Sequence, residues 1–123
     1  MKEFIADIVD KARENTYFRQ VITTGEHTQI VVMSISPGEE IGEEVHPDTD
    51  QVLYFVEGEG KAMLEGTETP FDEDDIFLVH AGTRHNFINT GDRDLKIITA
   101  YSPPHHPDGT IHKTKAEVAA ANY

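Results

Sequence analysis

The sequence contains no cysteine and no tryptophan, and only 10 lysine and arginine residues stand against 23 aspartate and glutamate residues. The absence of cysteine excludes disulfides, thiolate metal sites, iron–sulfur clusters and cysteine nucleophiles. A formal net charge of −13 opposes binding to nucleic acid or to an anionic membrane, because both depend on lysine and arginine contacts with phosphate. The same charge favours the uptake of divalent cations, although solubility alone also accounts for it.

Long apolar runs are also missing from the chain. No stretch approaches the roughly 18 residues that a membrane helix needs. Residues Met1 to Phe4 lack the apolar segment of a signal peptide. We therefore expect a cytoplasmic protein that binds neither membrane nor nucleic acid. At 123 residues, one domain over 1–123 is the natural expectation.

Short β-rich runs dominate the chain after a short amphipathic segment. Apolar residues recur at helical spacing from Phe4 to Ala12 and predict a helix within residues 1–16. The β-rich runs fill residues 17–102, with glycine or proline in the turns and no long helix between them. This pattern favours an all-β antiparallel barrel or sandwich over a parallel α/β sheet. The expected strands are 18–22, 29–35, 52–56, 61–65, 75–79, 85–88 and 95–101.

The last segment, residues 103–123, is a tail rich in proline and histidine. Four prolines or glycines lie within residues 102–109, so we expect no regular structure there. One or two helical turns are expected between Lys113 and Ala121. The tail either folds over the mouth of the barrel or wraps around its outside.

Two segments about thirty residues apart carry candidate metal ligands. Glu44 and His46 are two residues apart, so on a strand they point to the same face. Gln51 follows a short turn, and His85 begins a later strand. Imidazole nitrogen combined with carboxylate and amide oxygen suits a divalent zinc, manganese, iron, cobalt or nickel ion. We predict that these four residues bind one such ion. The competing interpretation is a solvated Glu44, with Gln51 and His85 hydrogen-bonded inside the barrel.

These two segments resemble the two signature motifs of the cupin superfamily. The resemblance covers about residues 29–101, and the spacing fits without a gap. At two ligand positions this chain departs from the family: Glu44 replaces a histidine, and Gln51 replaces a glutamate. Two turn positions also differ, at Asp74 and His80. The positions that match the family motifs are Gly38, His46, Gly58, Gly82, His85 and Asn89.

The resemblance implies an all-β fold, the cupin double-stranded β-helix, with the short helix packed outside it and the tail beyond. It is closest to small single-domain cupins grouped with mannose-6-phosphate isomerase-like proteins. It favours a metal-dependent isomerase acting on a small oxygen-rich metabolite, such as a sugar, sugar acid or keto acid. Two other functions stay open. One is a non-enzymatic module that binds or senses a small molecule. The other is a non-haem iron dioxygenase, because two histidines and a carboxylate are typical ligands of such iron.

The catalytic acid or base is not selected by the sequence. Histidine titrates near neutral pH, and carboxylates near a metal also transfer protons. The candidates are His105, His106, Glu40 and Glu43. We further predict a homodimer, because bare edge strands invite pairing, and the segment Tyr17–Ile22 is the expected contact.

Overall fold

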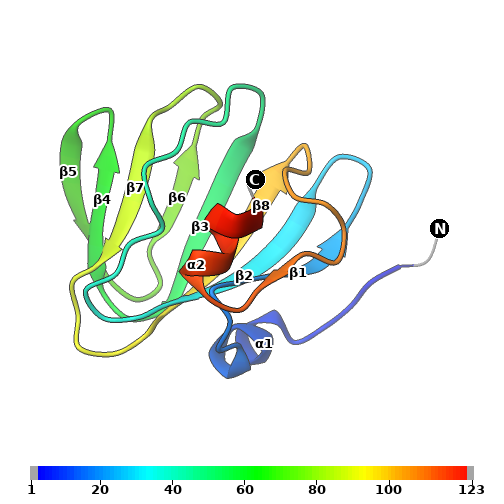
Figure 1. The fold of residues 1–123 in the computed structure, drawn as a ribbon, viewed down its shortest axis with the longest axis horizontal. Coiled ribbons are helices and arrows are strands. Elements are labelled where there is room, and N and C mark those ends of the chain that lie inside the picture. Colours follow the sequence, from blue (N-terminus) through cyan, green and yellow to red (C-terminus); the bar gives the residue numbers. More distant parts are fainter. Residues whose placement is uncertain (1–2, 122–123) are drawn as a thin grey trace.

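Two antiparallel sheets packed against each other form the body of the protein (Figure 1). The computed structural model describes residues 3–121. One sheet has six strands in the order β6-β3-β8-β2-β1-β9, and the other has three in the order β5-β4-β7. The prediction of an all-β antiparallel fold is confirmed. The strands are β1 (Arg19–Thr24), β2 (Gln29–Ile35), β3 (Asp50–Glu57), β4 (Gly60–Leu64), β5 (Thr67–Phe71), β6 (Ile76–Val79), β7 (His85–Asn89), β8 (Leu95–Ser102) and β9 (Ile111–His112).

The sequence pattern predicted seven of these strands and missed β5 and β9. The β5 strand is polar, contains Pro70 and lies at the edge of the small sheet, where a missing backbone donor is tolerated. The β9 strand lies between the segment 102–109, expected to be irregular, and the helical turns expected from Lys113, in a stretch for which the sequence predicts no element. Its two residues pair with Arg19 and Gln20 of β1. The open edge of β1 supplies the hydrogen-bond partners that local sequence does not reveal.

The same pairing corrects the expected dimer contact. The segment Tyr17–Ile22 was taken as a bare edge, but the tail covers it. The backbone N–H of Val21 donates to Thr110 at 2.9 Å, and that of Phe18 donates to Lys113 at 3.2 Å. A homodimer stays a prediction, and this edge is not available to form it.

The N-terminal helix is shorter than predicted. The α1 helix spans Ile8–Glu14, and Asp7 caps it by accepting a hydrogen bond from the backbone of Asp10 at 3.1 Å. Phe4 and Ile5 were expected inside the helix but precede the cap and are 52% and 95% exposed. The helix packs on the outer face of the six-stranded sheet through the buried Ala12.

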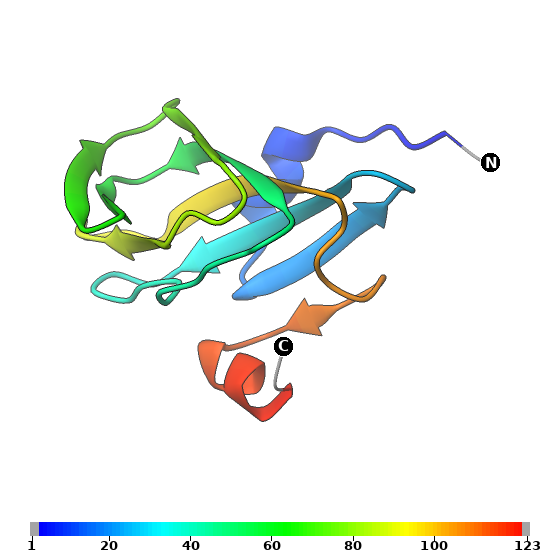
Figure 2. The ribbon, with the colours of Figure 1, turned by 90° about the horizontal axis from the view of Figure 1, so that it is seen from above.

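The second helix, α2, spans Lys115–Ala121, within the range where helical turns were expected. Figure 2 shows α1 and α2 on opposite sides of the large sheet. Val118 of α2 packs against the core between the two sheets. Within the described residues, neither helix has the length and apolarity of a membrane span.

Inward-facing side chains change from apolar to polar along the strands. Near the middle of the sandwich, Phe55 stacks on Phe71 with ring centroids 3.8 Å apart, and Phe87 packs beside them. Four residues along β3, the inward position holds Gln51, which is paired with Tyr101 of β8. The apolar part of the space between the sheets forms the core, and the polar end forms the candidate site.

Candidate metal site

Backbone hydrogen bonds bring the two motif segments side by side. The connection between β2 and β3 runs along β7 (Figure 1). Glu44 and His85 exchange two backbone hydrogen bonds of 2.9 Å each. The N–H of Gly82 donates to the carbonyl of His46 at 2.8 Å, from a turn in which Gly82 has a φ of +85°. Residues far apart in sequence are therefore held at one end of the sandwich.

Three of the four predicted ligands are buried and each keeps one polar atom without a protein partner. His46, Gln51 and His85 are 4%, 3% and 3% exposed. Among residues 3–121, no hydrogen bond of good geometry reaches Nε2 of His46, Oε1 of Gln51 or Nε2 of His85, although the Gln51 side chain lies close enough to His46 to raise its pKa slightly. Buried polar atoms are almost always hydrogen-bonded, since leaving one unpaired costs about 1–3 kcal/mol. Three such atoms among the predicted ligands indicate a partner that the protein itself does not supply.

Neighbouring groups orient two of these atoms as acceptors. Nδ1 of His85 lies 2.8 Å from the carbonyl of Thr83. A carbonyl only accepts, so Nδ1 carries the proton and Nε2 presents a lone pair. The Nε2 of Gln51 donates to Oγ1 of Thr99 at 3.0 Å, which leaves its oxygen free. Such outer contacts are typical of groups that orient metal ligands.

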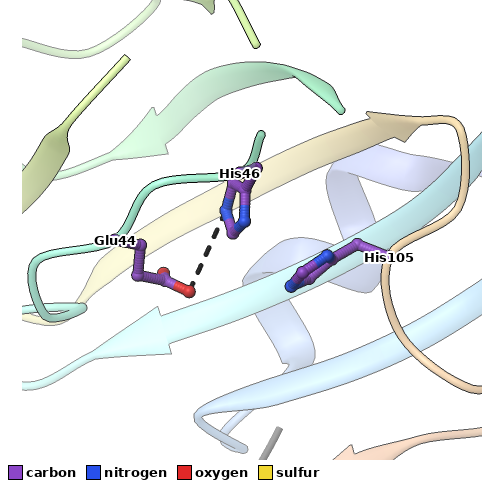
Figure 3. Close-up of side chains that lie close together, drawn as sticks. All are labelled: Glu44, His46 and His105. Carbon is purple, nitrogen blue, oxygen red and sulfur yellow. Dashed lines mark ion pairs between the residues drawn. The ribbon is translucent and has the colours of Figure 1, made fainter. Parts of the chain in front are cut away.

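Glu44, His46 and His105 form a compact group of possible ligands. One ligand atom from each lies within 4.8 Å of the others. Figure 3 shows the three side chains turned toward one another. The Oε2 of Glu44 is 3.9 Å from Nε2 of His46. The His46 ring lies 4.3 Å from that of His105 and 5.1 Å from that of His85, measured between centroids.

His105 reaches this group because the start of the tail is fastened to β2. The Nε2 of Gln29 donates to the carbonyl of His106 at 2.7 Å, and the N–H of His106 donates back to Oε1 of Gln29 at 3.0 Å. The His105 ring also stacks on Tyr101, with centroids 5.6 Å apart. The tail therefore folds over the polar end of the sandwich, and His105 itself stays exposed at the rim.

Burial disfavours the charged form of two imidazoles at this end of the sandwich, His46 and His105. Burial, together with the nearby His105 and His85, lowers the pKa of His46 to about 4. Burial also lowers the pKa of His105. With His46 neutral near pH 7, its contact with Glu44 is not an ion pair. Burial raises the pKa of Tyr101 to about 12, so the hydroxyl beside the site stays protonated.

Two of the other catalytic candidates lie away from this group, whereas the ring of His106 adjoins it, with its centroid 4.8 Å from that of His105. Glu43 forms an exposed ion pair with Arg84 at 2.8 Å, and Glu40 pairs through its backbone with Ile88, further along β7. His106 belongs to the tail, and its side chain is buried. Of the four candidates, the structure brings His105 to the ligand group.

Sequence reasoning missed several residues that shape this end of the sandwich. Gln29 and Thr99 carry no motif, and their contacts depend on segments far away in the chain. Arg19 offered a signal, because alternation along β1 places it on the same buried face as Val21.

Comparisons with known proteins agree with this architecture. The uncharacterized protein YrkC of Bacillus subtilis (strain 168) is 40% identical to this chain over 126 residues, covering 98% of this chain and 68% of YrkC. The crystal structure of BH2720 from Bacillus halodurans has a TM-score of 0.95 at 41% identity, covering 97% of this chain and 95% of that one. KdgF from Halomonas sp. shares the fold, with a TM-score of 0.67 at 23% identity over 71% of this chain and 78% of its own.

The family model described as a cupin domain matches residues 31–101, which include both motif segments. The match covers more than half of the chain and runs from within β2 to Tyr101, near the end of β8. The strand order, the paired motif segments and this match together show that the chain belongs to the cupin family.

Proposed function

We propose that the chain binds one divalent metal ion through Glu44, His46, Gln51 and His85 and acts as an isomerase-type enzyme. The ligand would be a small oxygen-rich metabolite with a hydroxy-carbonyl unit. The observation that carries this proposal is the trio of buried polar atoms on His46, Gln51 and His85 that have no hydrogen-bond partner among residues 3–121.

The donor set fits such an ion. Two imidazole nitrogens, one amide oxygen and one carboxylate oxygen form the mixed nitrogen and oxygen set that zinc and neighbouring divalent metals accept. The lowered pKa of His46 keeps its Nε2 available at neutral pH. A bound ion would act as a Lewis acid that polarises a carbonyl oxygen of the ligand.

His105 is the residue best placed to move a proton. Its ring is 4.3 Å from that of His46, and it is exposed where a ligand would enter. Its pKa is lowered by burial, so its free nitrogen accepts a proton near pH 7. Tyr101 stacks on the ring and limits its rotation. We assign His105 proton transfer rather than ligation because it is exposed, whereas the buried side chains of His46, Gln51 and His85 are the ones that leave a polar atom unpaired.

Metal titration tests the site. Protein purified without a histidine tag should bind one zinc or cobalt ion per chain. His46→Ala and His85→Ala should each weaken binding by more than about 100-fold, since even outer contacts of a metal ligand are worth 10–100-fold. His27→Ala is the matched control, because the His27 side chain is 86% exposed and its ion-pair partner is the exposed Glu26. Wild-type protein without stoichiometric metal would refute the proposal.

Hydrogen exchange tests the chemistry separately. Proton transfer next to a carbonyl incorporates deuterium from D₂O into the ligand, and NMR detects this for any sugar, sugar acid or keto acid. Wild-type protein should catalyse the exchange with at least one member of such a panel, and His105→Ala should lose it while keeping the metal. Stoichiometric metal with no exchange across the panel would favour the binding module over the enzyme.

A further inference from the structure

Arg19 is a buried cation next to the candidate metal site. It begins β1, pairs with Met33 of β2 on one side and with His112 of β9 on the other, and is only 2% exposed. Its side chain shares the inner face with Val21, which belongs to the core between the sheets. The guanidinium therefore lies between the sheets, at the end where the polar residues gather.

Among residues 3–121, Arg19 forms no ion pair, and its guanidinium lies 5.2 Å from the centroid of the Phe18 ring. Its Nη1 donates to Nδ1 of His112 at 3.3 Å, and the side chain also donates to the hydroxyl of Tyr101. Both partners are uncharged. Its Nε has no hydrogen-bond partner.

This arrangement is costly unless something else supplies negative charge. A guanidinium stays protonated in proteins, so burial cannot neutralise it. Leaving a buried charge unpaired costs several kcal/mol. Burial, together with the charge of Arg19, lowers the pKa of the neighbouring His46, His105 and His106. Imidazole is either neutral or positively charged, so none of these histidines can compensate the guanidinium.

A single ring separates Arg19 from the ligand group. Tyr101, which accepts the hydrogen bond from Arg19, contacts His46 edge-on with ring centroids 5.8 Å apart. On its other side it stacks on His105. The guanidinium therefore lies one ring away from His46 and from His105, which is exposed at the rim.

We propose that Arg19 is the anion-binding residue of this site and that the natural ligand carries a carboxylate. The inference rests on the proposed metal site, which would hold the hydroxy-carbonyl end of the same molecule. Glu44 is the one acidic member of the ligand group. A divalent ion and Arg19 together outweigh the charge of Glu44, and a ligand carboxylate reduces the remaining positive charge. A sugar acid or keto acid is thus favoured over a neutral sugar.

The chemistry of the group favours a carboxylate over a phosphate. The planar fork of a guanidinium matches the two oxygens of a carboxylate, and the free Nε–H is one prong of that fork. A phosphate dianion calls for several cations, whereas the arginines Arg84 and Arg93 are exposed and paired with Glu43 and Glu73. The acidic exterior also repels anions, so a specific buried cation is needed to select one.

Calorimetry on the zinc-loaded protein tests this inference. The carboxylate probes are pyruvate, 2-oxoglutarate and D-glucuronate, and the other arms are D-glucose and inorganic phosphate. Wild type should bind at least one carboxylate more tightly than either control compound. Arg19→Met should weaken that binding at least tenfold, Arg19→Lys should weaken it less, and Arg93→Met should leave it unchanged. Zinc affinity should stay within a few-fold of wild type in all three variants.

Thermal unfolding without ligand separates binding from a structural role. Replacing an unpaired buried charge with an apolar side chain of similar length should leave the melting temperature unchanged or raise it. An arginine that only braces the tail would lower the melting temperature when replaced and leave carboxylate binding intact, which would overturn the inference. If Arg19→Met does not fold, Arg19→Lys is the deciding variant. Carboxylate binding by Arg19→Lys that is as tight as wild type would also overturn the inference.

The outcomes distinguish this inference from the proposed function. Failure of wild type to bind zinc refutes the metal site. If the metal-free protein still binds a carboxylate and Arg19→Met abolishes that binding, the role of Arg19 is supported independently of the metal. Zinc binding combined with equal carboxylate affinity in wild type and Arg19→Met refutes the role of Arg19 and leaves the metal site standing. Binding of D-glucose or phosphate as tight as that of any carboxylate also refutes it.

Discussion

Two of the predicted ligands are oriented by a neighbour that occupies just one of their two polar atoms. The carbonyl of Thr83 holds Nδ1 of His85, and the hydroxyl of Thr99 holds Nε2 of Gln51. In both cases the remaining atom is a buried acceptor without a protein partner. The rotamers are thereby set before any ion binds, which reduces the entropy that binding would otherwise cost.

Thr99→Val tests this orientation. Valine keeps the shape of the buried side chain but removes the acceptor for Gln51, so the amide is free to turn away. We expect metal affinity to fall about tenfold, as for other outer contacts of metal ligands, and stability to fall by about 1–2 kcal/mol. Thr90→Val, at an exposed position, is the control. Unchanged metal affinity in Thr99→Val would show that the hydroxyl does not orient the ligand.

The sequence could name the ligand candidates because local rules govern them. Alternation places Glu44 and His46 on one face, and a short turn returns the chain at Gln51. The approach of His105 could not be predicted, since it depends on contacts between the tail and Gln29, 77 residues from His106. Alternation along β1 indicates the inward face for Arg19, but its pairing with the tail could not be predicted, since His112 lies 93 residues away.

At the scale of elements, close packing between β4, β5 and β7 fixes the position of β7, which carries His85 and Asn89 of the second motif. Gly60 of β4 faces Asn89 of β7 on one side and Phe71 of β5 on the other. A Cβ added at Gly60 would lie 2.1 Å from the carbonyl oxygen of Ile88 and 2.6 Å from the Phe71 ring. The small sheet therefore tolerates no side chain at this position.

Gly60→Ala should destabilise the protein by about 3 kcal/mol, at the upper end for overpacked sites, because backbone must move to relieve the contact. Urea unfolding measures the change. Gly25→Ala is the matched control, since its nearest contact would be 3.3 Å from the carbonyl of Thr28, in a turn. Equal stability of the two variants would contradict the packing described.

The start of the tail, at His105 and His106, is held by one side chain of β2. Gln29→Leu removes the hydrogen bonds to His105 and His106 while keeping a buried side chain of similar size. We expect hydrogen exchange into the ligand to fall at least tenfold, with metal affinity within a few-fold of wild type. Gln20→Leu, on the neighbouring strand, is the control. Loss of metal binding in Gln29→Leu would instead make His105 a ligand.

Strand alternation and turn residues predicted most elements, and the errors share one cause. The helix was extended to Phe4 because apolar spacing continues there, but the cap at Asp7 begins the helix later. The β9 strand was missed because proline and glycine precede it. In each case a tertiary contact or a cap outweighed a local pattern.

Over the whole molecule, charge is divided between an acidic surface and a neutral or cationic interior. Burial lowers the pKa of His46 to about 4 and that of His106 to about 3, from 6.5. The unfolded chain therefore binds more protons than the folded protein between pH 6.5 and these values. Stability must fall as pH is lowered through that window.

The metal-free protein should thus lose about 2 kcal/mol per buried histidine between pH 6.5 and pH 5, since one proton is worth about 1.4 kcal/mol per pH unit. Urea unfolding with a chelator present measures this. His106→Asn should reduce the slope of the free energy of unfolding against pH by the equivalent of about one proton, and His27→Asn should leave that slope unchanged. Stability that is constant or rises from pH 6.5 to pH 5 would contradict the burial of neutral imidazoles.

A crystal structure of the zinc-soaked protein, with anomalous data collected on both sides of the zinc edge, tests the central claim most directly. The account predicts one ion at about 2.0–2.1 Å from Nε2 of His46 and Nε2 of His85, and at about 2.0–2.2 Å from oxygens of Glu44 and Gln51. An ion held only by surface carboxylates, or no anomalous peak between these four residues, would contradict it.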